Sequence, residues 1–341
     1  MPTDQLPAVR EGRETLCVAV LGTGSAGLGH LKALSTLEAV RPLAIPVRRG
    51  RVAELRSAGH DAVDEFEGAR RLGARLCIIA TETARHAADA SLALRAGCDV
   101  LVEKPLGVVA AEAREVCRQA SRVGHMVSVG CVLRFSESLN AFRASLSALG
   151  ALHAVRIECQ SYLPDWRPHR PYRDSYSSRA GNGGVLRDLI HEIDYAGWLY
   201  GWPQALHASV RNLGRLGIES EEGADLLWTT PAGCAVSVSL DYLSRPARRR
   251  MRASGEHGTL EWDGVEGTVT LALAHAPVRV TRFSRTGNQM FVEQARAFVN
   301  ASRGCVDPRA ATAEDGVRAL AVCDAARRSS ARACQEPVVD S

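Results

Sequence analysis

Lysine is nearly absent from this chain, so the position of each lysine is informative. The 341 residues include 42 lysines and arginines, and only Lys32 and Lys104 are lysines. Lys104 stands in Glu103-Lys-Pro105, directly after the apolar run Asp99–Val102. The carboxyl end of a parallel strand is the edge where ligands bind. An ammonium there can donate to a substrate oxygen and stabilise a developing alkoxide, so we predict that Lys104 is catalytic.

A histidine between two carboxylates is the second candidate for chemistry. Asp188, His191 and Asp194 are spaced i, i+3 and i+6 in a segment that predicts a helix over 185–200, so they should share one broad face. Flanking carboxylates can orient an imidazole and raise its basicity. Such a group suits a general base that takes a hydroxyl proton while hydride leaves the same carbon. A metal site and a purely structural His191 are the alternatives, and the chain shows no further ligand set that would favour a metal.

The third candidate is a glycine-rich turn, because residues 22–27 read G-x-G-x-x-G. Gly22 permits a tight turn, Gly24 lets a pyrophosphate approach the backbone, and Gly27 allows close helix packing. The following helix would offer free N–H groups to the phosphates, beginning with Ser25 and Ala26. The pattern predicts a dinucleotide site, and a glycine turn without a ligand is the alternative.

The region after the second predicted strand bears on which dinucleotide is bound. NAD-binding chains usually place an acid there to hold the ribose hydroxyl. Residues 45–51 contain no acid, but they contain Arg48, Arg49 and Arg51. A guanidinium binds a 2′-phosphate well, so we expect NADP(H) to be preferred, with NAD(H) possible. Solvated arginines in an arginine-rich chain are the alternative.

The elements that must hold these residues follow from hydrophobic patterning. The first part of the chain alternates apolar runs with helical segments, which is typical of a parallel sheet covered on both faces. Beyond about residue 150, short strand-like runs separated by turns predict an antiparallel sheet. The expected strands lie at 16–21, 42–47, 75–80, 99–102, 126–130, 154–162, 205–210, 225–230, 235–242, 248–254, 268–273 and 278–283. The fold class is therefore α/β, with a doubly wound parallel sheet followed by an α+β domain with an open-faced, mainly antiparallel sheet. We place the domains at 1–134 and 135–341, with the last helices free to pack back on the first.

Composition excludes several classes of protein. Hydrophobic residues make up 46% and charged residues 23%, and the net charge is +4, which fits a globular protein and gives no sign of nucleic-acid binding. No apolar run would cross a bilayer, and the polar segment 1–14 does not read as a signal peptide. The ten cysteines form no C-x-x-C pair, so we expect reduced cysteines, no metal site and a cytoplasmic location.

Taken together, these features resemble the Gfo/Idh/MocA oxidoreductases, which include glucose-fructose oxidoreductase and inositol dehydrogenases. The resemblance rests on four motifs: the glycine turn with His30, Thr81-Glu-Thr-x-x-His86, Glu103-Lys-Pro105, and Gly183-Gly followed by the Asp188, His191 and Asp194 group. It implies hydride exchange between a nicotinamide and a sugar or cyclitol. It assigns Lys104 to the substrate oxygen, His191 to acid/base chemistry and a nearby carboxylate, Asp188, to assistance. It also implies cofactor contacts by Thr81, His86, Glu103 and Lys104, and a homodimer or homotetramer formed through the C-terminal sheet.

One departure from the family pattern concerns Asp188. The acid usually precedes the histidine by four residues, and here it precedes it by three. On a continuous helix that change rotates Asp188 by about 100°. The neighbouring residues look like those of a branch associated with polysaccharide or unusual-sugar biosynthesis.

The substrate itself is indicated only by a polar loop before the helix. The loop over 163–182 is rich in arginine, and it offers Trp166 and Arg167 as substrate contacts. Several guanidiniums there would favour an anionic sugar, although a solvated loop is an equal alternative. Arg134 and Asp194 are further expected substrate contacts, and the basic segment 245–252 is expected at a surface or subunit contact. An imine reductase and a non-catalytic dinucleotide sensor remain as other functions of the same fold.

Overall fold

The first half of the chain folds around a six-stranded sheet. The computed structural model describes residues 15–284 and 287–339, and segment 1–14 lies outside the described residues. In the first sheet the order is β14-β5-β4-β3-β1-β2, and the pairs among β1 to β5 are parallel. The strands are β1 (Leu16–Leu21), β2 (Val40–Ile45), β3 (Leu76–Ile79), β4 (Asp99–Val102), β5 (Val127–Val129) and β14 (Ala311–Thr312). The predicted doubly wound sheet is confirmed.

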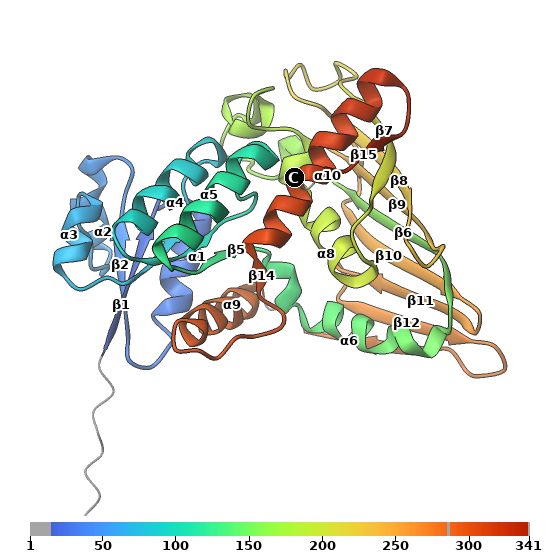
Figure 1. The fold of residues 1–341 in the computed structure, drawn as a ribbon, viewed down its shortest axis with the longest axis horizontal. Helices are drawn as coiled ribbons and strands as arrows, with labels where there is room; N and C mark the ends of the chain where they lie inside the picture. Colours follow the sequence, from blue (N-terminus) through green and yellow to red (C-terminus); the bar gives the residue numbers. More distant parts are fainter. Residues whose placement is uncertain (1–14, 285–286, 340–341) are drawn as a thin grey trace, which may run out of the picture.

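Helices cover both faces of this sheet, at the left of Figure 1. They are α1 (Ser25–Leu34), α2 (Val52–Ser57), α3 (Phe66–Arg71), α4 (His86–Arg95), α5 (Ala110–Val123) and α9 (Gly287–Ala301). Strands β3 and β4 are almost wholly buried, as parallel strands between two helical layers must be. Helix α5 buries its apolar stripe and ends at Gly124, whose φ of 69° is the left-handed geometry that glycine allows.

The C-terminal part of the chain returns to this first sheet. Strand β14 pairs antiparallel with β5. Helix α9 packs on α1, where the Phe291 ring lies 5.0 Å from the His30 ring. Val292, Ala295 and Phe298 of α9 belong to the same buried cluster as Val18 and Leu31.

The second half is a nine-stranded sheet of order β13-β12-β11-β10-β6-β9-β8-β7-β15. Only the β6–β9 pair is parallel within the described residues. The strands are β6 (Leu152–Gln160), β7 (Ala205–Arg211), β8 (Gly223–Thr229), β9 (Ala235–Asp241), β10 (Arg248–Gly255), β11 (Gly258–Asp263), β12 (Thr268–Leu273), β13 (Arg279–Arg282) and β15 (Glu336–Pro337). The mainly antiparallel second sheet is thereby confirmed.

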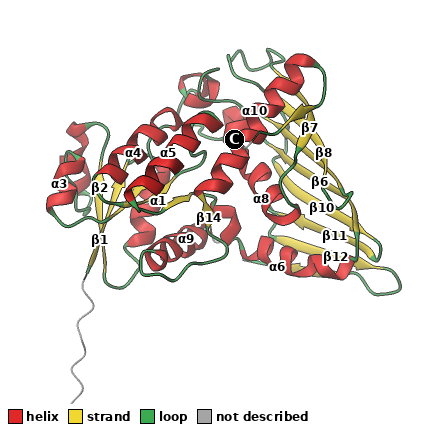
Figure 2. Cartoon of the chain, in the orientation of Figure 1, coloured by secondary structure: helices red, strands yellow, loops and turns green. Residues whose placement is uncertain are grey.

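Helices cover only one face of the second sheet, as Figure 2 shows. They are α6 (Glu137–Ser145), α7 (Val185–Asp188), α8 (Ile190–Tyr200) and α10 (Ala313–Arg332). Along β6 the side chains of Val155, Ile157 and Cys159 are buried and their neighbours are not. This alternation is that of a strand with one covered and one open face.

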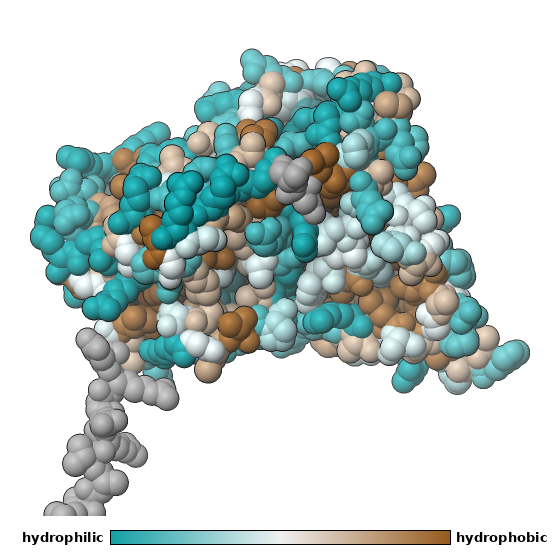
Figure 3. Space-filling model, in the orientation of Figure 1, coloured by the Kyte–Doolittle hydropathy of each residue, from teal (hydrophilic) through white to brown (hydrophobic). Residues whose placement is uncertain are grey.

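The polarity of the surface differs between the two halves of the molecule. In the view of Figure 3, α4 and α5 present a mostly hydrophilic surface, and hydrophobic residues gather over the strands between α8 and α6. None of the helices in the described part of the chain is both long and apolar enough to cross a bilayer.

Candidate active site

The glycine turn joins β1 to α1 with the geometry that the motif requires. Gly22 has a φ of +96°, and a Cβ there would collide with the carbonyl oxygen of Ala80. A Cβ on Gly27 would collide with the carbonyl oxygen of Gly22. Around Gly24, by contrast, a Cβ would meet no protein atom within 4 Å. Two of the glycines are therefore fixed by packing, and the third faces open space at the start of α1, where a phosphate can approach.

Three arginines follow β2, and one of them contacts this turn. Arg51 reaches back to the turn, and its Nη1 donates to the carbonyl oxygen of Thr23 at 3.0 Å. Arg49 pairs with Glu65 at 3.2 Å and is largely exposed. Arg48 is exposed and has no ion pair among the residues that the structure describes. Of these three guanidiniums, that of Arg51 is placed at the glycine turn, and it also pairs with Glu54 at 3.0 Å.

Glu103 is bound to its own framework. Its Oε1 lies 2.7 Å from Nε2 of the buried His30, and its Oε2 accepts from the backbone N–H of Lys104 at 3.2 Å. Burial pushes the pKa of Glu103 up, but the hydrogen bond from His30 and the nearby positive charges leave it below its ordinary value. The carboxylate therefore joins α1 to the end of β4 and fixes the backbone that presents Lys104.

His86 connects the ends of β3 and β4 in a similar way. Its Nδ1 lies 2.7 Å from the carbonyl oxygen of Pro105, and its Nε2 lies 3.1 Å from that of Thr81. Burial lowers the pKa of His86. The Thr81 hydroxyl donates to Asp89 at 2.8 Å. The side chains of both sequence-predicted residues thus have partners within the first half of the chain, in the loops after β3 and β4 and in α4.

Lys104 reaches across to the second half of the chain. Its Nζ donates to the carbonyl oxygen of Asp188 at 2.6 Å, three residues before His191. Burial, followed by the charges of Lys104 and Arg249, holds the pKa of His191 well below its usual value. His191 is therefore a neutral imidazole at pH 7, the form that accepts a proton. Lys104 thus binds the backbone three residues before His191, and its charge acts on that imidazole; their joint catalytic role stays a prediction.

The helix that carries His191 is not continuous, contrary to the expectation over 185–200. Helix α7 ends at Asp188, Leu189 has φ −98° and ψ 29°, and α8 starts at Ile190. Because the helix is interrupted between Asp188 and His191, the rotation expected for Asp188 on one straight helix does not apply.

The expected pair of carboxylates around His191 is also wrong. The Asp188 carboxylate accepts from the Tyr242 hydroxyl at 2.7 Å, and Asp194 faces Arg134. The buried Nδ1 of His191 has no hydrogen-bond partner among the described residues. The basicity of this imidazole is set by burial and by neighbouring cations rather than by a bound carboxylate.

Arg134 and Asp194, both expected to touch substrate, are engaged with each other. Arg134 donates from Nη2 and Nε to the two carboxylate oxygens of Asp194 at 2.7 and 3.0 Å, and from Nη1 to Asp315 at 3.0 Å. The side chains of Arg134 and Asp194 are 2% and 3% exposed. Burial raises the pKa of Asp194, against the lowering effect of Arg134. Each side chain is thus occupied by the other, and the substrate contacts expected of them stay a prediction.

Trp166 and Arg167 lie on the loop that follows β6. The Trp166 ring meets the Tyr242 ring edge-on at 5.3 Å, and its Nε1 donates to Ser161 at 2.8 Å. Arg167 is exposed. Burial and the neighbouring Asp188 raise the pKa of Tyr176, and the positive charge of Arg167 acts against them. Trp166 therefore packs on Tyr242, which binds Asp188, and Arg167 lies near Tyr176, which is also close to Asp188.

Four residues near Asp188 and His191 were not predicted from the sequence: Tyr176, Tyr242, Glu192 and Arg249. Arg249 donates from Nε to the fully buried Glu192 at 2.7 Å. Within the segment 245–252, which was expected at a surface or subunit contact, Arg249 instead faces inward. Its signal was available, because Arg249 lies on the same face of β10 as Met251 and Ala253, which are buried. The two tyrosines carried no comparable signal.

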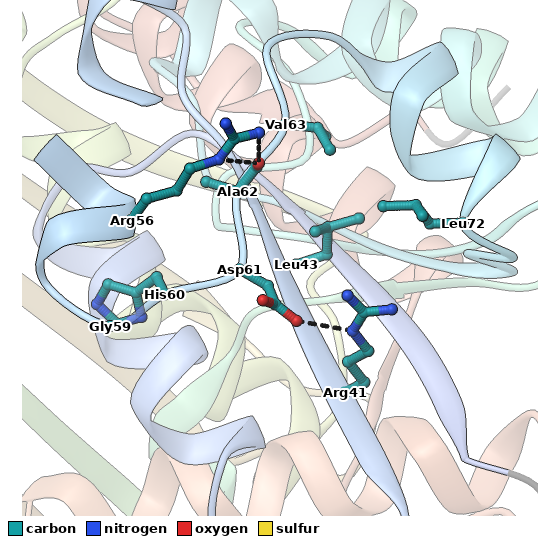
Figure 4. A pocket seen from close by; sticks show the side chains of 9 residues that line it. All are labelled: Arg41, Leu43, Arg56, Gly59, His60, Asp61, Ala62, Val63 and Leu72. Atoms are coloured by element: carbon teal, nitrogen blue, oxygen red, sulfur yellow. Dashed lines mark hydrogen bonds and ion pairs between the residues drawn. The ribbon is translucent and has the colours of Figure 1, made fainter. Parts of the chain in front are cut away.

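A hollow at the outer edge of β2 lies apart from these residues (Figure 4). Arg41 and Arg56 line it. Arg41 donates to the carboxylate of Asp61 at 2.7 Å, and Arg56 donates to the carbonyl oxygen of Ala62 at 2.8 Å. Neither the glycine turn nor Lys104 lines this hollow. Throughout the ranges 15–284 and 287–339, no three side chains of metal-ligating type gather in a group.

Comparison with known proteins agrees with this geometry. The family model described as "Oxidoreductase family, NAD-binding Rossmann fold" matches residues 16–131, and the one described as "GFO/IDH/MocA C-terminal domain" matches residues 145–261. Together the two matches span more than half of the chain.

Relatives match over nearly the whole length. The rhizopine catabolism protein MocA of Rhizobium meliloti is 29% identical over 91% of this chain and 93% of its own. Inositol 2-dehydrogenase 1 of Saccharopolyspora erythraea is 27% identical over 92% and 94%. Among solved structures, levoglucosan dehydrogenase in complex with NADH and L-sorbose superposes with a TM-score of 0.85 at 18% identity, over 96% of this chain and 99% of its own.

Proposed function

The chain belongs to the GFO/IDH/MocA oxidoreductase family, and from that premise we propose that it exchanges a hydride between NADP(H) and a hydroxyl or keto carbon of a sugar, a cyclitol or a sugar-derived acid. The observation that carries the proposal is the approach of Lys104 Nζ to the Asp188 carbonyl, 2.6 Å away and three residues before His191. An ammonium and a neutral imidazole from different halves of the chain then face one bound ligand.

The residues at the glycine turn fit a dinucleotide. Gly24 has open space where a Cβ would stand, and the N-terminus of α1 follows it. Bound there, the cofactor supplies or accepts the hydride. The lysine ammonium donates to the substrate oxygen and stabilises the negative charge that develops on it. The neutral His191 takes the hydroxyl proton during oxidation and returns it during reduction.

Preference for NADP(H) is supported by charge around the end of β2. No acid stands within residues 45–51, Arg48 and Arg49 follow β2, and Arg51 contacts the turn. Arg48 is exposed and unpaired among the described residues, so its guanidinium is free to bind a 2′-phosphate.

The substrate class is supported by the loop over the site and by the relatives. Trp166 offers an aromatic surface, 36% exposed, on which the apolar face of a sugar ring can stack. Arg167 offers an exposed cation beside Tyr176, which favours a substrate with a carboxylate. Inositol and levoglucosan dehydrogenases act on compounds of the cyclitol and sugar type, as their names state.

Assembly and location belong to the same proposal. The outer face of the second sheet is uncovered in this chain, and Leu227 on it is 51% exposed. A second copy covering this face would make a homodimer, or a homotetramer with two such pairs. Every cysteine in the described ranges is free, which suits a reducing cytoplasm.

The test is a binding measurement followed by a substrate screen. Affinities for NADPH and NADH are measured by fluorescence titration, and neutral sugars, cyclitols and sugar acids are then screened with the preferred cofactor at 340 nm. We expect tighter binding of NADPH and turnover of at least one polyol or sugar acid. Tighter binding of NADH would refute the cofactor preference, and dinucleotide binding without any turnover would favour a sensor.

A further inference from the structure

A chain of contacts connects the loop after β6 to the catalytic lysine. The Trp166 ring packs edge-on against Tyr242 at 5.3 Å with the planes at 89°. The Tyr242 hydroxyl donates to the Asp188 carboxylate at 2.7 Å. The carbonyl oxygen of the same Asp188 accepts from Lys104 Nζ at 2.6 Å.

The two inner members of this chain of contacts are buried. Tyr242 has no exposed surface and Asp188 is 6% exposed. Leu163, which begins the loop, donates its backbone N–H to the carbonyl oxygen of Tyr242 at 2.9 Å. Because the loop, the end of β9 and the start of the catalytic helix share these bonds, a shift of one is transmitted to the next.

The break in the helix at Leu189 gives this contact its importance. Asp188 stands at the last position of α7, and its carbonyl group is not part of α8. That carbonyl shares its peptide group with the Leu189 N–H, which donates to the carbonyl oxygen of Val185 at 2.9 Å, and the bond from Tyr242 is a second constraint on the same residue. Without the bond to Tyr242, the buried carboxylate loses a donor, and we expect Asp188 to relax toward another partner and shift the carbonyl oxygen that Lys104 binds.

We propose that Tyr242 is a positioning residue that places the Lys104 ammonium through Asp188, and that Trp166 links this placement to the substrate loop. The inference rests on the proposed role of Lys104. Tyr242 itself touches neither substrate nor cofactor. A ligand that packs against Trp166 presses on Tyr242, and the lysine is then presented in one position.

The two lysines of the chain allow a test that needs no substrate. Lysine labelled with ¹³C at Cε gives two NMR signals, from Lys32 and Lys104, and Lys104→Met assigns them. We expect Tyr242→Phe, which removes only the hydroxyl, to move the Lys104 signal and leave that of Lys32 in place. Trp166→Ala should also move the Lys104 signal.

Tyr195→Phe is the matched control. Tyr195 has no exposed surface, meets Trp262 edge-on at 5.6 Å, and donates to the buried carboxylate of Glu192 at 3.4 Å. The Tyr195→Phe variant should lose as much thermal stability as Tyr242→Phe and leave the Lys104 signal unchanged. A Lys104 signal that does not move in Tyr242→Phe, or that moves equally in both variants, overturns the proposal. If the Lys104 signal does not move in Trp166→Ala, the loop plays no part in placing the lysine.

A kinetic measurement separates this proposal from the proposed function. With a substrate in hand, Tyr242→Phe should lower kcat by about 10-fold, less than the ~100-fold that a misplacement of 1 Å can cost. NADPH affinity should stay at the wild-type level. Wild-type kcat in Tyr242→Phe, alongside an inactive Lys104→Met, refutes the positioning role alone. Full activity in Lys104→Met refutes the catalytic role proposed for the lysine, and the NMR result then still decides whether Tyr242 places its ammonium.

Discussion

Arg134 and Asp194 form a bidentate ion pair that joins the end of the first sheet to helix α8, with N···O distances of 2.7 and 3.0 Å. Arg134 also binds Asp315, which closes a capping box with Thr312 at the start of α10. One guanidinium thus ties together the segment after β5, the helix of His191 and the helix that follows β14. Asp194 lies on the same helix as His191, so this junction holds the element that carries the imidazole.

Breaking that pair should cost stability. Asp194→Asn leaves the Arg134 charge buried with half of its partners, and we expect a loss of about 3–5 kcal/mol in the free energy of unfolding, measured by urea titration. The control is Asp225→Asn, which breaks the exposed Arg211–Asp225 pair and should cost no more than ~1 kcal/mol. Equal losses in the two variants would contradict the importance given to burial here.

Lys104→Met should abolish turnover and spare cofactor binding. The side chain keeps its length but can no longer donate to a substrate oxygen, so kcat should fall by about 10²–10³-fold, measured at saturating NADPH. Lys32→Met is the control, because Lys32 lies exposed on α1, and it should retain wild-type kcat. Substantial activity in Lys104→Met would remove the lysine from the mechanism.

The pH dependence should follow the unusual state of His191. Burial and the charges of Lys104 and Arg249 lower its pKa well below the ordinary 6.5. A base works only when deprotonated, so the oxidation rate should stay level as the pH falls through 6.5 and decline only at lower pH. Lys104→Met removes one of the two cations, so the pKa of His191 should rise in that variant, which histidine NMR can measure. A fall in rate centred at or above pH 6.5 would be inconsistent with this environment.

The glycines of the turn should respond differently to the same substitution. In Gly27→Ala the new methyl group meets the carbonyl oxygen of Gly22, so we expect a lower melting temperature. In Gly24→Ala the methyl group meets open space, and a φ of −75° suits alanine. That variant should keep its stability and bind NADPH about 10-fold more weakly, a loss of ~1.4 kcal/mol. Unchanged affinity in Gly24→Ala would place the phosphates elsewhere.

Most of the fold was predictable because periodicity reports burial. The parallel strands are continuous apolar runs and the second sheet alternates, so both sheets could be read from the sequence. Strand β11 and helix α6 were not among the predicted elements. The convergence of Lys104 and His191 was indicated by strand-end position and by motif.

The sequence could not indicate which partners the carboxylates of Asp188 and Asp194 bind. Asp188 and Asp194 have the spacing of a shared helical face, but the break at Leu189 and the partners Tyr242 and Arg134 turn them apart. Those partners come from distant parts of the chain, and spacing along one helix carries no information about them. The depressed pKa of His191 likewise arises from tertiary neighbours.

The return of β14 and α9 to the first sheet has a consequence for biogenesis. During translation, the nucleotide-binding half emerges from the ribosome without its edge strand and without the wall of its core that Val292, Ala295 and Phe298 provide. That half is completed only after residues 287–312 have been synthesised. Until then Val18 and Leu31 lack part of their cover, and we expect the partly made chain to need protection by chaperones.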